Sequence, residues 1–173
     1  IRINFIEPQG STGIKQTSIR NSADIDLFIG LDPRYVTRHK FPSHKERREF
    51  LQIQFKTLIQ TWLMPCVKNL GFQNLQLSYA EHPYISGIYD NLEFDIVLCF
   101  DISAEDLQNN GPFTAMDRSP HHSRFVRDQL TEDQKNDVRL LKHFFQCQWC
   151  YGDKSPIGRS GFIGYVAELL IYA

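Results

Sequence analysis

The fold is decided by the stretch Asp24-Ile25-Asp26-Leu27-Phe28-Ile29, whose alternation predicts a β-strand. Side chains two residues apart on a strand point to the same face, so Asp24 and Asp26 share one face. The intervening isoleucines and leucine share the other. We therefore expect the apolar face to pack against a core and the acidic face to bind a ligand.

The two acids on one face are the first functional signal. At about 7 Å apart and an effective dielectric of about 20, two carboxylates repel by roughly 2 kcal/mol. If the strand is half-exposed and both acids are solvated, the pair is only structural, and this stretch alone does not exclude that interpretation. A divalent cation between the carboxylates would turn the repulsion into attraction.

A third acid, Asp95, stands in a stretch that is otherwise almost wholly apolar, residues 93–98. A lone acid in such a strand is costly unless something pairs with it. If this strand lies beside the first one, three carboxylates converge. Three oxygen ligands leave room for water and phosphate oxygens, which suits one or two Mg²⁺ ions holding a nucleoside triphosphate for in-line attack.

Upstream of the acidic strand lies a turn rich in small residues, Pro8-Gln9-Gly10-Ser11-Thr12-Gly13, which follows an alternating segment at residues 1–6. Free backbone N–H groups and the Ser11 hydroxyl in such a turn can bind the β and γ phosphates of a nucleotide. Gly-Ser alone is a weak signal. Followed by Asp-Ile-Asp and then a distant Asp on another strand, it becomes much stronger.

The rest of the chain divides into a part with strands and a part with helices. A helix is predicted from the N-cap Ser43 to Pro65 or slightly beyond, with Gly71 as its stop. Strands are predicted at residues 75–79, 84–89 and 92–100, the last two joined by an Asp90-Asn91 hairpin turn. Three helices follow, at residues 119–130, 132–149 and 160–172. We place a domain boundary near Asp117.

Amino-acid composition excludes few classes of protein. The 173 residues are 42% hydrophobic and 13% aromatic, enough for one packed domain or a domain with the start of a second. A formal charge of -1 argues neither for nor against a nucleic-acid partner.

The ends of the chain carry no targeting signal. The longest apolar run, residues 161–173, contains Glu168 and is too short to span a bilayer, and the amino end lacks a signal-peptide pattern. We expect a cytoplasmic protein with no membrane partner. The first residue, Ile1, and the helix-like end at Ala173 indicate a segment cut from a longer polypeptide.

The four cysteines sit in apolar stretches, which predicts buried thiols in a reducing compartment rather than a disulfide framework. The pair Cys147 and Cys150 has the spacing of a metal or redox motif, but no second pair accompanies it. For Cys147 and Cys150 a structural role is therefore favoured over metal binding or redox chemistry.

Taken together, these motifs resemble the polymerase-beta-like nucleotidyltransferases and, within them, the archaeal class I CCA-adding enzymes. The similarity covers nearly the whole chain and keeps the order of the family's blocks. Beyond the Gly-Ser and Asp-Ile-Asp motifs, it rests on residues 79–84, 94–99, 117–122, 138–142, 151–152, 161–165 and 168–170. It implies an α+β fold: a palm domain with a mixed or antiparallel sheet over residues 1–117, followed by the helical start of a central nucleotide-binding domain over residues 118–173.

The resemblance also implies roles for individual residues. It makes three side chains the metal ligands: Asp24, Asp26 and Asp95. It implies that the nucleotide is held by Gly10 and Ser11 at the triphosphate and by His122, Lys142 and Tyr151, with Ser119 close by. The family's Arg after Gly-Ser is missing, and Lys15 is its substitute here, at the loss of a bidentate phosphate contact. The first metal position is usually Glu in this family and is Asp24 here.

The activity implied is template-independent addition of CMP and AMP, from CTP and ATP, to the 3′ end of tRNA, with pyrophosphate released and two Mg²⁺ ions as cofactors. A homodimer is compatible with the sequence. Two alternatives stay open: a synthetase of oligonucleotide or cyclic-nucleotide signals, and a non-catalytic nucleotide- or RNA-binding module. A basic stretch between Arg34 and Arg48 is either a solvated face or a contact for the RNA backbone.

Overall fold

The computed structural model describes residues 2–19, 24–35, 43–79, 82–152 and 161–173. Its strands are β1 (Ile3–Pro8), β2 (Ile25–Leu31), β3 (Gln73–Tyr79), β4 (Pro83–Tyr89) and β5 (Leu92–Phe100). Its α-helices are α1 (His44–Leu58), α2 (Met64–Asn69), α3 (Ala104–Asn110), α4 (Ser119–Gln129), α5 (Glu132–Cys147) and α6 (Gly164–Tyr172). Shorter helical turns are η1 (Pro33–Tyr35), η3 (Ile59–Leu63) and η4 (Ala115–Arg118).

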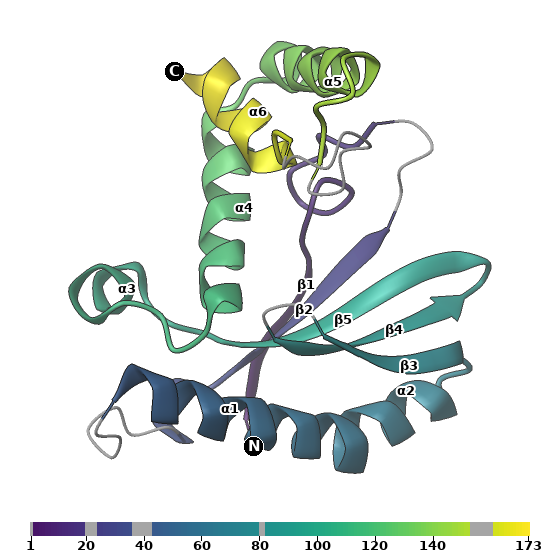
Figure 1. Cartoon of the computed structure of the whole chain (residues 1–173), viewed down its shortest axis with the longest axis vertical. Coiled ribbons are helices and arrows are strands. Elements are labelled where there is room, and N and C mark those ends of the chain that lie inside the picture. Colours follow the sequence, from purple (N-terminus) through teal and green to yellow (C-terminus); the bar gives the residue numbers. More distant parts are fainter. Residues whose placement is uncertain (1, 20–23, 36–42, 80–81, 153–160) are drawn as a thin grey trace.

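The strands form one mixed sheet in the order β1-β2-β5-β4-β3 (Figure 1). Strands β2 and β5 run parallel, and the other neighbours are antiparallel. The predicted strand with Asp24 and Asp26 therefore lies beside the predicted strand with Asp95. This confirms both the α+β class and the adjacency on which the proposed metal site depends.

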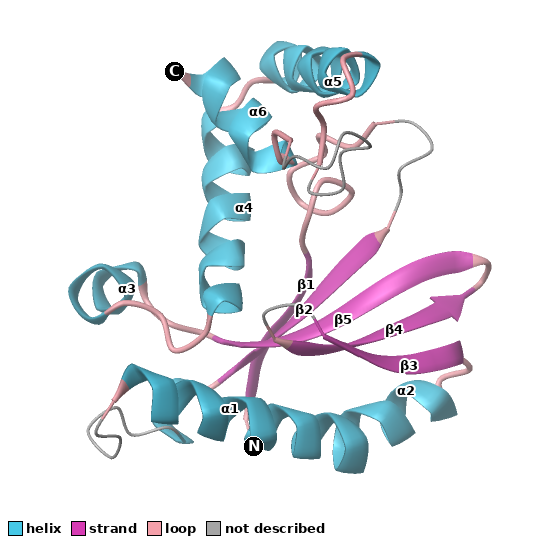
Figure 2. Ribbon diagram, in the orientation of Figure 1, coloured by secondary structure: helices cyan, strands magenta, loops and turns pink. Residues whose placement is uncertain are grey.

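The two faces of the sheet have different partners. Helices α1 and α2 run along one face, and α4 to α6 lie on the other side (Figure 2). The α1 face is apolar: Ile29 and Leu98 contribute to the main core together with Leu51, Phe55 and Ile59 of the long helix. The opposite face carries Asp26 and Asp95, and further along it a smaller buried cluster of Phe28, Val97 and Cys99. The expected apolar packing face is confirmed, but the acidic face also packs along part of its length.

The long helix begins where its cap predicts. The Ser43 hydroxyl accepts a hydrogen bond from the Glu46 N–H at 3.2 Å. The helix passes through one widened turn, η3, and continues as α2 to Asn69, with Gly71 in the left-handed region at φ +97°. The predicted Asp90-Asn91 turn is also present, with φ values of 50° and 61° that suit a type I′ hairpin.

The carboxyl-terminal helices have a core of their own. It consists of Val126, Leu130, Val138, Phe145 and Ala167. At the junction with the sheet, buried Asp117 accepts hydrogen bonds from the backbone N–H groups of Phe100, Phe113 and Thr114. The predicted boundary between residues 117 and 118 stays a prediction.

Some predicted elements differ from the observed ones. Helix α3 was not predicted; Ser103 caps it, but none of its residues is buried, so it has no apolar period to detect. Helix α5 ends at Cys147, short of residue 149, and α6 begins at Gly164, while position 160 lies outside the described residues.

The four cysteines are free, as expected, but the prediction that they are buried is confirmed for one of them alone. Only Cys99 is buried; Cys150 is intermediate, and Cys66 and Cys147 are exposed. Apolar neighbours in sequence do not bury a residue on the outer side of a helix. In the described part of the chain, no helix is long and apolar enough to cross a membrane.

Candidate active site

The carboxylates of Asp26 and Asp95 are neighbours across the parallel strands β2 and β5. The two residues are direct register partners, and Asp24 precedes β2 by one residue. Burial raises the pKa of Asp26 to about 6, with the negative charges of Asp95 and Asp24 adding to the rise and Lys15 opposing it. The other two predicted acids therefore both act on Asp26.

Carboxylate oxygens are the donors that Mg²⁺ prefers, so the chemistry of this set fits such an ion. Among the described residues, however, no three His, Cys, Asp or Glu side chains form a group already placed to hold a metal. Asp24, which precedes β2, is exposed. The structure thus brings the three acids to one region without a preformed set of ligands.

The Gly10-Ser11 turn packs directly against Asp26. A Cβ atom added to Gly10, at φ +66°, would lie 2.0 Å from Asp26 Oδ2, and the Gln9 N–H donates to the Asp26 carbonyl at 2.7 Å. The turn closes on itself because the Thr17 N–H donates to the Ser11 carbonyl at 2.9 Å. The predicted phosphate-binding turn and the predicted metal ligand are therefore in contact.

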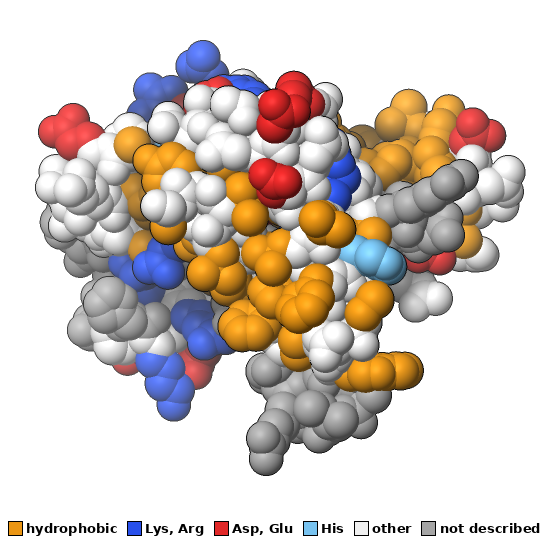
Figure 3. Space-filling model, turned by 90° about the horizontal axis from the view of Figure 1, so that it is seen from above, with side chains coloured by type: hydrophobic (Ala, Val, Ile, Leu, Met, Phe, Trp, Pro, Cys, Tyr) orange, Lys and Arg blue, Asp and Glu red, His pale blue; other side chains and the backbone are white. Residues whose placement is uncertain are grey.

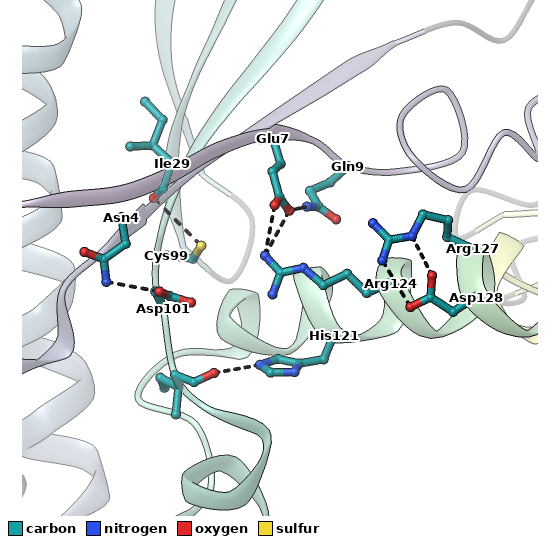
Figure 4. A network of polar contacts seen from close by, with 11 residues as sticks. Asn4, Glu7, Gln9, Ile29, Cys99, Asp101, His121, Arg124, Arg127 and Asp128 are labelled. Atoms are coloured by element: carbon teal, nitrogen blue, oxygen red, sulfur yellow. Dashed lines mark hydrogen bonds and ion pairs between the residues drawn. The ribbon is translucent and has the colours of Figure 1, made fainter.

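Strand β1, which leads into this turn, is held by helix α4 (Figure 4). The Arg124 guanidinium donates to both carboxylate oxygens of Glu7, at 3.1 and 3.0 Å, and lies over the Phe5 ring. Gln9 donates to the same carboxylate at 3.1 Å. His121 lies 2.9 Å from the Ile102 carbonyl and ties the start of α4 to the end of the sheet. The turn beside Asp26 is thus braced by the helical part of the chain.

We expect Gly10→Ala to lower nucleotide transfer about a hundredfold, since displacing a reacting group by about 1 Å can have that effect. The new methyl group has no room beside Asp26 and requires an unfavourable φ. Steady-state transfer assays and a melting curve measure the effect. Gly111→Ala is the matched control: Gly111 also has positive φ, at +69°, but nothing lies within 4 Å of its added Cβ. Equal losses in the two variants would contradict a specific role for Gly10.

The predicted nucleotide-binding lysines lie in a buried ion network. Glu168 of α6 accepts from Lys15 at 2.8 Å, from Lys142 of α5 at 3.0 Å and from the Thr17 hydroxyl at 2.6 Å. Lys142 also donates to the Thr17 carbonyl at 3.0 Å. The Lys15 and Lys142 side chains are 11% and 1% exposed, and that of Glu168 is 0% exposed. Three segments far apart in sequence thus meet at one carboxylate.

The network keeps its charges. Burial acts to raise the pKa of Glu168, but the two ammonium groups and their hydrogen bonds outweigh it and hold the pKa below its ordinary value. Burial lowers the pKa of Lys142, and Glu168 opposes that shift. In this arrangement both lysines are already occupied by Glu168. A triphosphate would have to compete with that carboxylate or bind at its edge.

His122 and Tyr151 border the same network. The His122 ring stacks on Tyr165 with centroids 4.4 Å apart, and burial, then Lys15 and Arg118, lower the pKa of His122. A Cβ added to Gly164 would lie 3.3 Å from both Lys142 Nζ and the Tyr151 hydroxyl oxygen. Ser119 is the first residue of α4, about one turn before His122. The structure therefore gathers Lys15, Lys142, Tyr151 and His122 around Glu168.

Sequence reasoning missed the central member of this group. Glu168 stands alone among apolar residues in its helix, the same signal that marked Asp95. Tyr165 and Thr17 gave no signal of their own. His82 is 4% exposed, contacts the Phe55 ring edge-on and hydrogen-bonds to the Leu98 backbone, which are structural contacts in the main core.

The basic stretch is only partly described. Arg38, His39 and Lys40 lie outside the described residues. Arg34 makes an ion pair with Asp32, while Arg47 and Arg48 line a cavity of about 390 Å³ together with Arg118. The RNA-backbone contact stays a prediction for this stretch.

Curated relatives share sequence along nearly the whole chain. It is 35% identical over 167 residues to the CCA-adding enzyme of Pyrobaculum aerophilum and 43% identical over 166 residues to that of Pyrobaculum neutrophilum, covering 96% of this chain each time. The CCA-adding enzyme of Sulfolobus acidocaldarius is 35% identical over 157 residues. The chain spans only 34%, 34% and 32% of the lengths of these relatives. No family profile matches the chain.

Among solved structures, the fold matches terminal uridylyl transferase 4 from Trypanosoma brucei with bound UTP and UMP. The TM-score is 0.50 at 14% identity, over 96% of this chain and 45% of that one. This likeness concerns the fold: a mixed five-stranded sheet with helices, as in that nucleotidyltransferase. In sequence, the chain is similar to a segment of the archaeal CCA-adding enzymes that makes up about a third of their length.

Proposed function

We propose that the protein adds CMP and AMP, from CTP and ATP, to the 3′ end of tRNA without a template. The observation that carries this proposal is the register pair of Asp26 and Asp95 with the Gly10 turn against it, in a chain up to 43% identical to CCA-adding enzymes. We further propose that the reaction takes place in the cytoplasm, where the substrate tRNA matures. A homodimer stays a prediction from the sequence.

We assign the metal site to Asp24, Asp26 and Asp95, which would hold one or two Mg²⁺ ions. When bound, such ions lower the pKa of the attacking hydroxyl and neutralise charge on the leaving pyrophosphate. The acids contribute by approaching one another once a cation offsets their repulsion. The raised pKa of Asp26, about 6, marks the group that gains most from a positive neighbour.

We assign the triphosphate to the side of the site formed by the turn after β1. Gly10 and Ser11 offer backbone N–H groups and a hydroxyl beside Asp26. Lys15 and Lys142 carry two positive charges against the one negative charge of Glu168, which leaves a net positive region for phosphate oxygens. His122, Tyr151 and Ser119 border that region and would contact the nucleotide.

The acceptor then belongs on the other side of the carboxylates. In-line displacement requires the attacking hydroxyl and the leaving pyrophosphate to lie on opposite sides of the reacting phosphorus. A groove of about 460 Å³ opens on that side, over β3, β4 and β5, and is lined by Asp24, Asp95, Ser86, Gln76 and Asn74 among others. Its neutral polar side chains suit the ribose hydroxyls of the last nucleotide of an RNA.

The rest of a longer polypeptide would complete the tRNA site. Apolar side chains gather over the end of the molecule formed by α4 to α6 (Figure 3). Exposed members on α5 and α6 include Leu140, Phe144, Leu169 and Leu170. Because the relatives are about three times as long, we propose that this surface packs against the additional chain.

The test is a transfer assay with the full-length protein, Mg²⁺, labelled CTP or ATP, and tRNA lacking its terminal CCA. We expect stepwise extension of the tRNA by three nucleotides. Absence of extension, with a labelled product formed from nucleotide alone, would instead indicate a synthetase of nucleotide signals. No product in either reaction would indicate a binding module.

A further inference from the structure

A row of four polar side chains crosses the sheet at the proposed metal site. The strand registers pair Asp26 with Asp95, Asp95 with Ser86, and Ser86 with Gln76. Residues paired directly across strands point to the same face of the sheet. The carboxylate pair therefore continues as a line of neutral polar groups on β4 and β3.

Within this row, Ser86 is bonded to the carboxylate of Asp95. Its hydroxyl lies 2.8 Å from Asp95 Oδ1 and 3.2 Å from the hydroxyl of Ser78 on β3. Ser86 has one proton to donate, and the carboxylate is the stronger acceptor. Ser86 accordingly donates to Asp95 and accepts the hydroxyl proton of Ser78. The two serines thus form a short relay that ends on one oxygen of Asp95.

We propose that Ser86, supported by Ser78, is a positioning residue that fixes the orientation of Asp95 for cation binding. With Oδ1 engaged, Oδ2 is left for a cation or for the hydroxyl of an acceptor. Without the bond, the carboxylate can rotate about its side chain and turn away from Asp26. The inference rests on the proposed function, because it assigns a role to a neighbour of a proposed metal ligand.

The location of Ser86 separates this role from simple packing. It lies on the groove side of Asp95 and lines the proposed acceptor groove, whereas the main core lies on the opposite face of the sheet. Partners that orient a metal ligand typically change metal affinity by about 10- to 100-fold when removed. Loss of a half-buried hydroxyl from a strand has no such effect unless the ligand beside it moves.

The experiment compares Ser86→Ala, Ser86→Thr and Ser78→Ala in the full-length protein. Mn²⁺ binding is measured by electron paramagnetic resonance without nucleotide, and transfer kinetics are measured alongside. For Ser86→Ala we expect Mn²⁺ affinity to fall about tenfold or more. We expect kcat to fall with little change in KM for the nucleotide, because the triphosphate is held on the other side of the carboxylates. Ser86→Thr keeps the hydroxyl and should restore both values, and Ser78→Ala should have a smaller effect.

Unchanged Mn²⁺ affinity in Ser86→Ala would overturn the inference, as would an equal loss in Ser86→Thr with both variants folded by melting temperature. Asp95→Asn distinguishes this outcome from failure of the proposed function. If Asp95→Asn loses Mn²⁺ binding and Ser86→Ala does not, only the role of Ser86 is wrong. If Asp95→Asn binds Mn²⁺ normally, the metal assignment itself is wrong.

Discussion

Asp95→Ala is expected to abolish nucleotide transfer, with a loss of at least about a thousandfold in kcat. A bound metal ion contributes several kcal/mol to the transition state, and each 1.36 kcal/mol corresponds to a factor of about ten in rate. The melting temperature should be unchanged or slightly higher, because Asp95 acts on Asp26 as a like charge and raises its pKa. The measurement is single-turnover transfer together with thermal unfolding without metal.

The matched control for Asp95 is Glu93→Ala. Glu93 lies two residues away on β5 and lines the same groove, but it is exposed and has no part in the proposed ligand set. It should retain most of the kcat, and any contribution to acceptor binding should appear in the KM for tRNA. If Asp95→Ala turns over at the normal rate, or if Glu93→Ala is equally impaired, the assignment of the catalytic carboxylates is wrong.

Glu168→Ala is expected to have the largest effect on stability. It leaves the ammonium groups of Lys15 and Lys142 buried without their counter-charge, and breaking a buried pair in this way costs roughly 3–5 kcal/mol. For a chain of this length that corresponds to a fall of about 10 °C in melting temperature. Transfer should also decline, because the turn after β1 loses its tie to α5 and α6.

Glu49→Ala serves as the control for Glu168. Glu49 also pairs with a lysine, Lys45, at 4.0 Å, but the two side chains are 60% and 85% exposed. Exposed pairs contribute little, so its melting temperature should barely change. A similar melting temperature for Glu168→Ala and the unmodified protein would show that the network is not a structural link between the sheet and the helices.

Local pattern was enough to predict the acidic strand, its apolar reverse face and the hairpin turn. The three acids could be recognised from sequence: Asp24 and Asp26 lie two residues apart, and Asp95 is the lone acid in an apolar strand. Burying an acid without a partner is unfavourable, so such positions indicate a function. The adjacency of β2 and β5 followed from requiring those costs to be offset together. The register confirms it residue for residue, with Asp26 opposite Asp95.

The contacts of the buried lysines could not be predicted from local sequence pattern. The resemblance implied only that Lys142 holds the nucleotide, and the structure shows it buried against Glu168 and Thr17. Thr17 and Lys142 are 125 positions apart, and no periodicity reports a contact between residues so distant. Helix α3 was not predicted because it is capped but has no buried residues, so its sequence lacks the periodic apolar positions of a packed helix.

The most direct test of the central claim is a crystal of the full-length protein grown with Mn²⁺ and CTP, with the metal located by its anomalous signal. We expect one or two peaks within about 2.3 Å of carboxylate oxygens from Asp24, Asp26 and Asp95. The nucleotide phosphates should lie on the Gly10 side of those peaks. A well-bound nucleotide with no peak at these three residues, or with Asp95 turned away from the ion, would contradict the account.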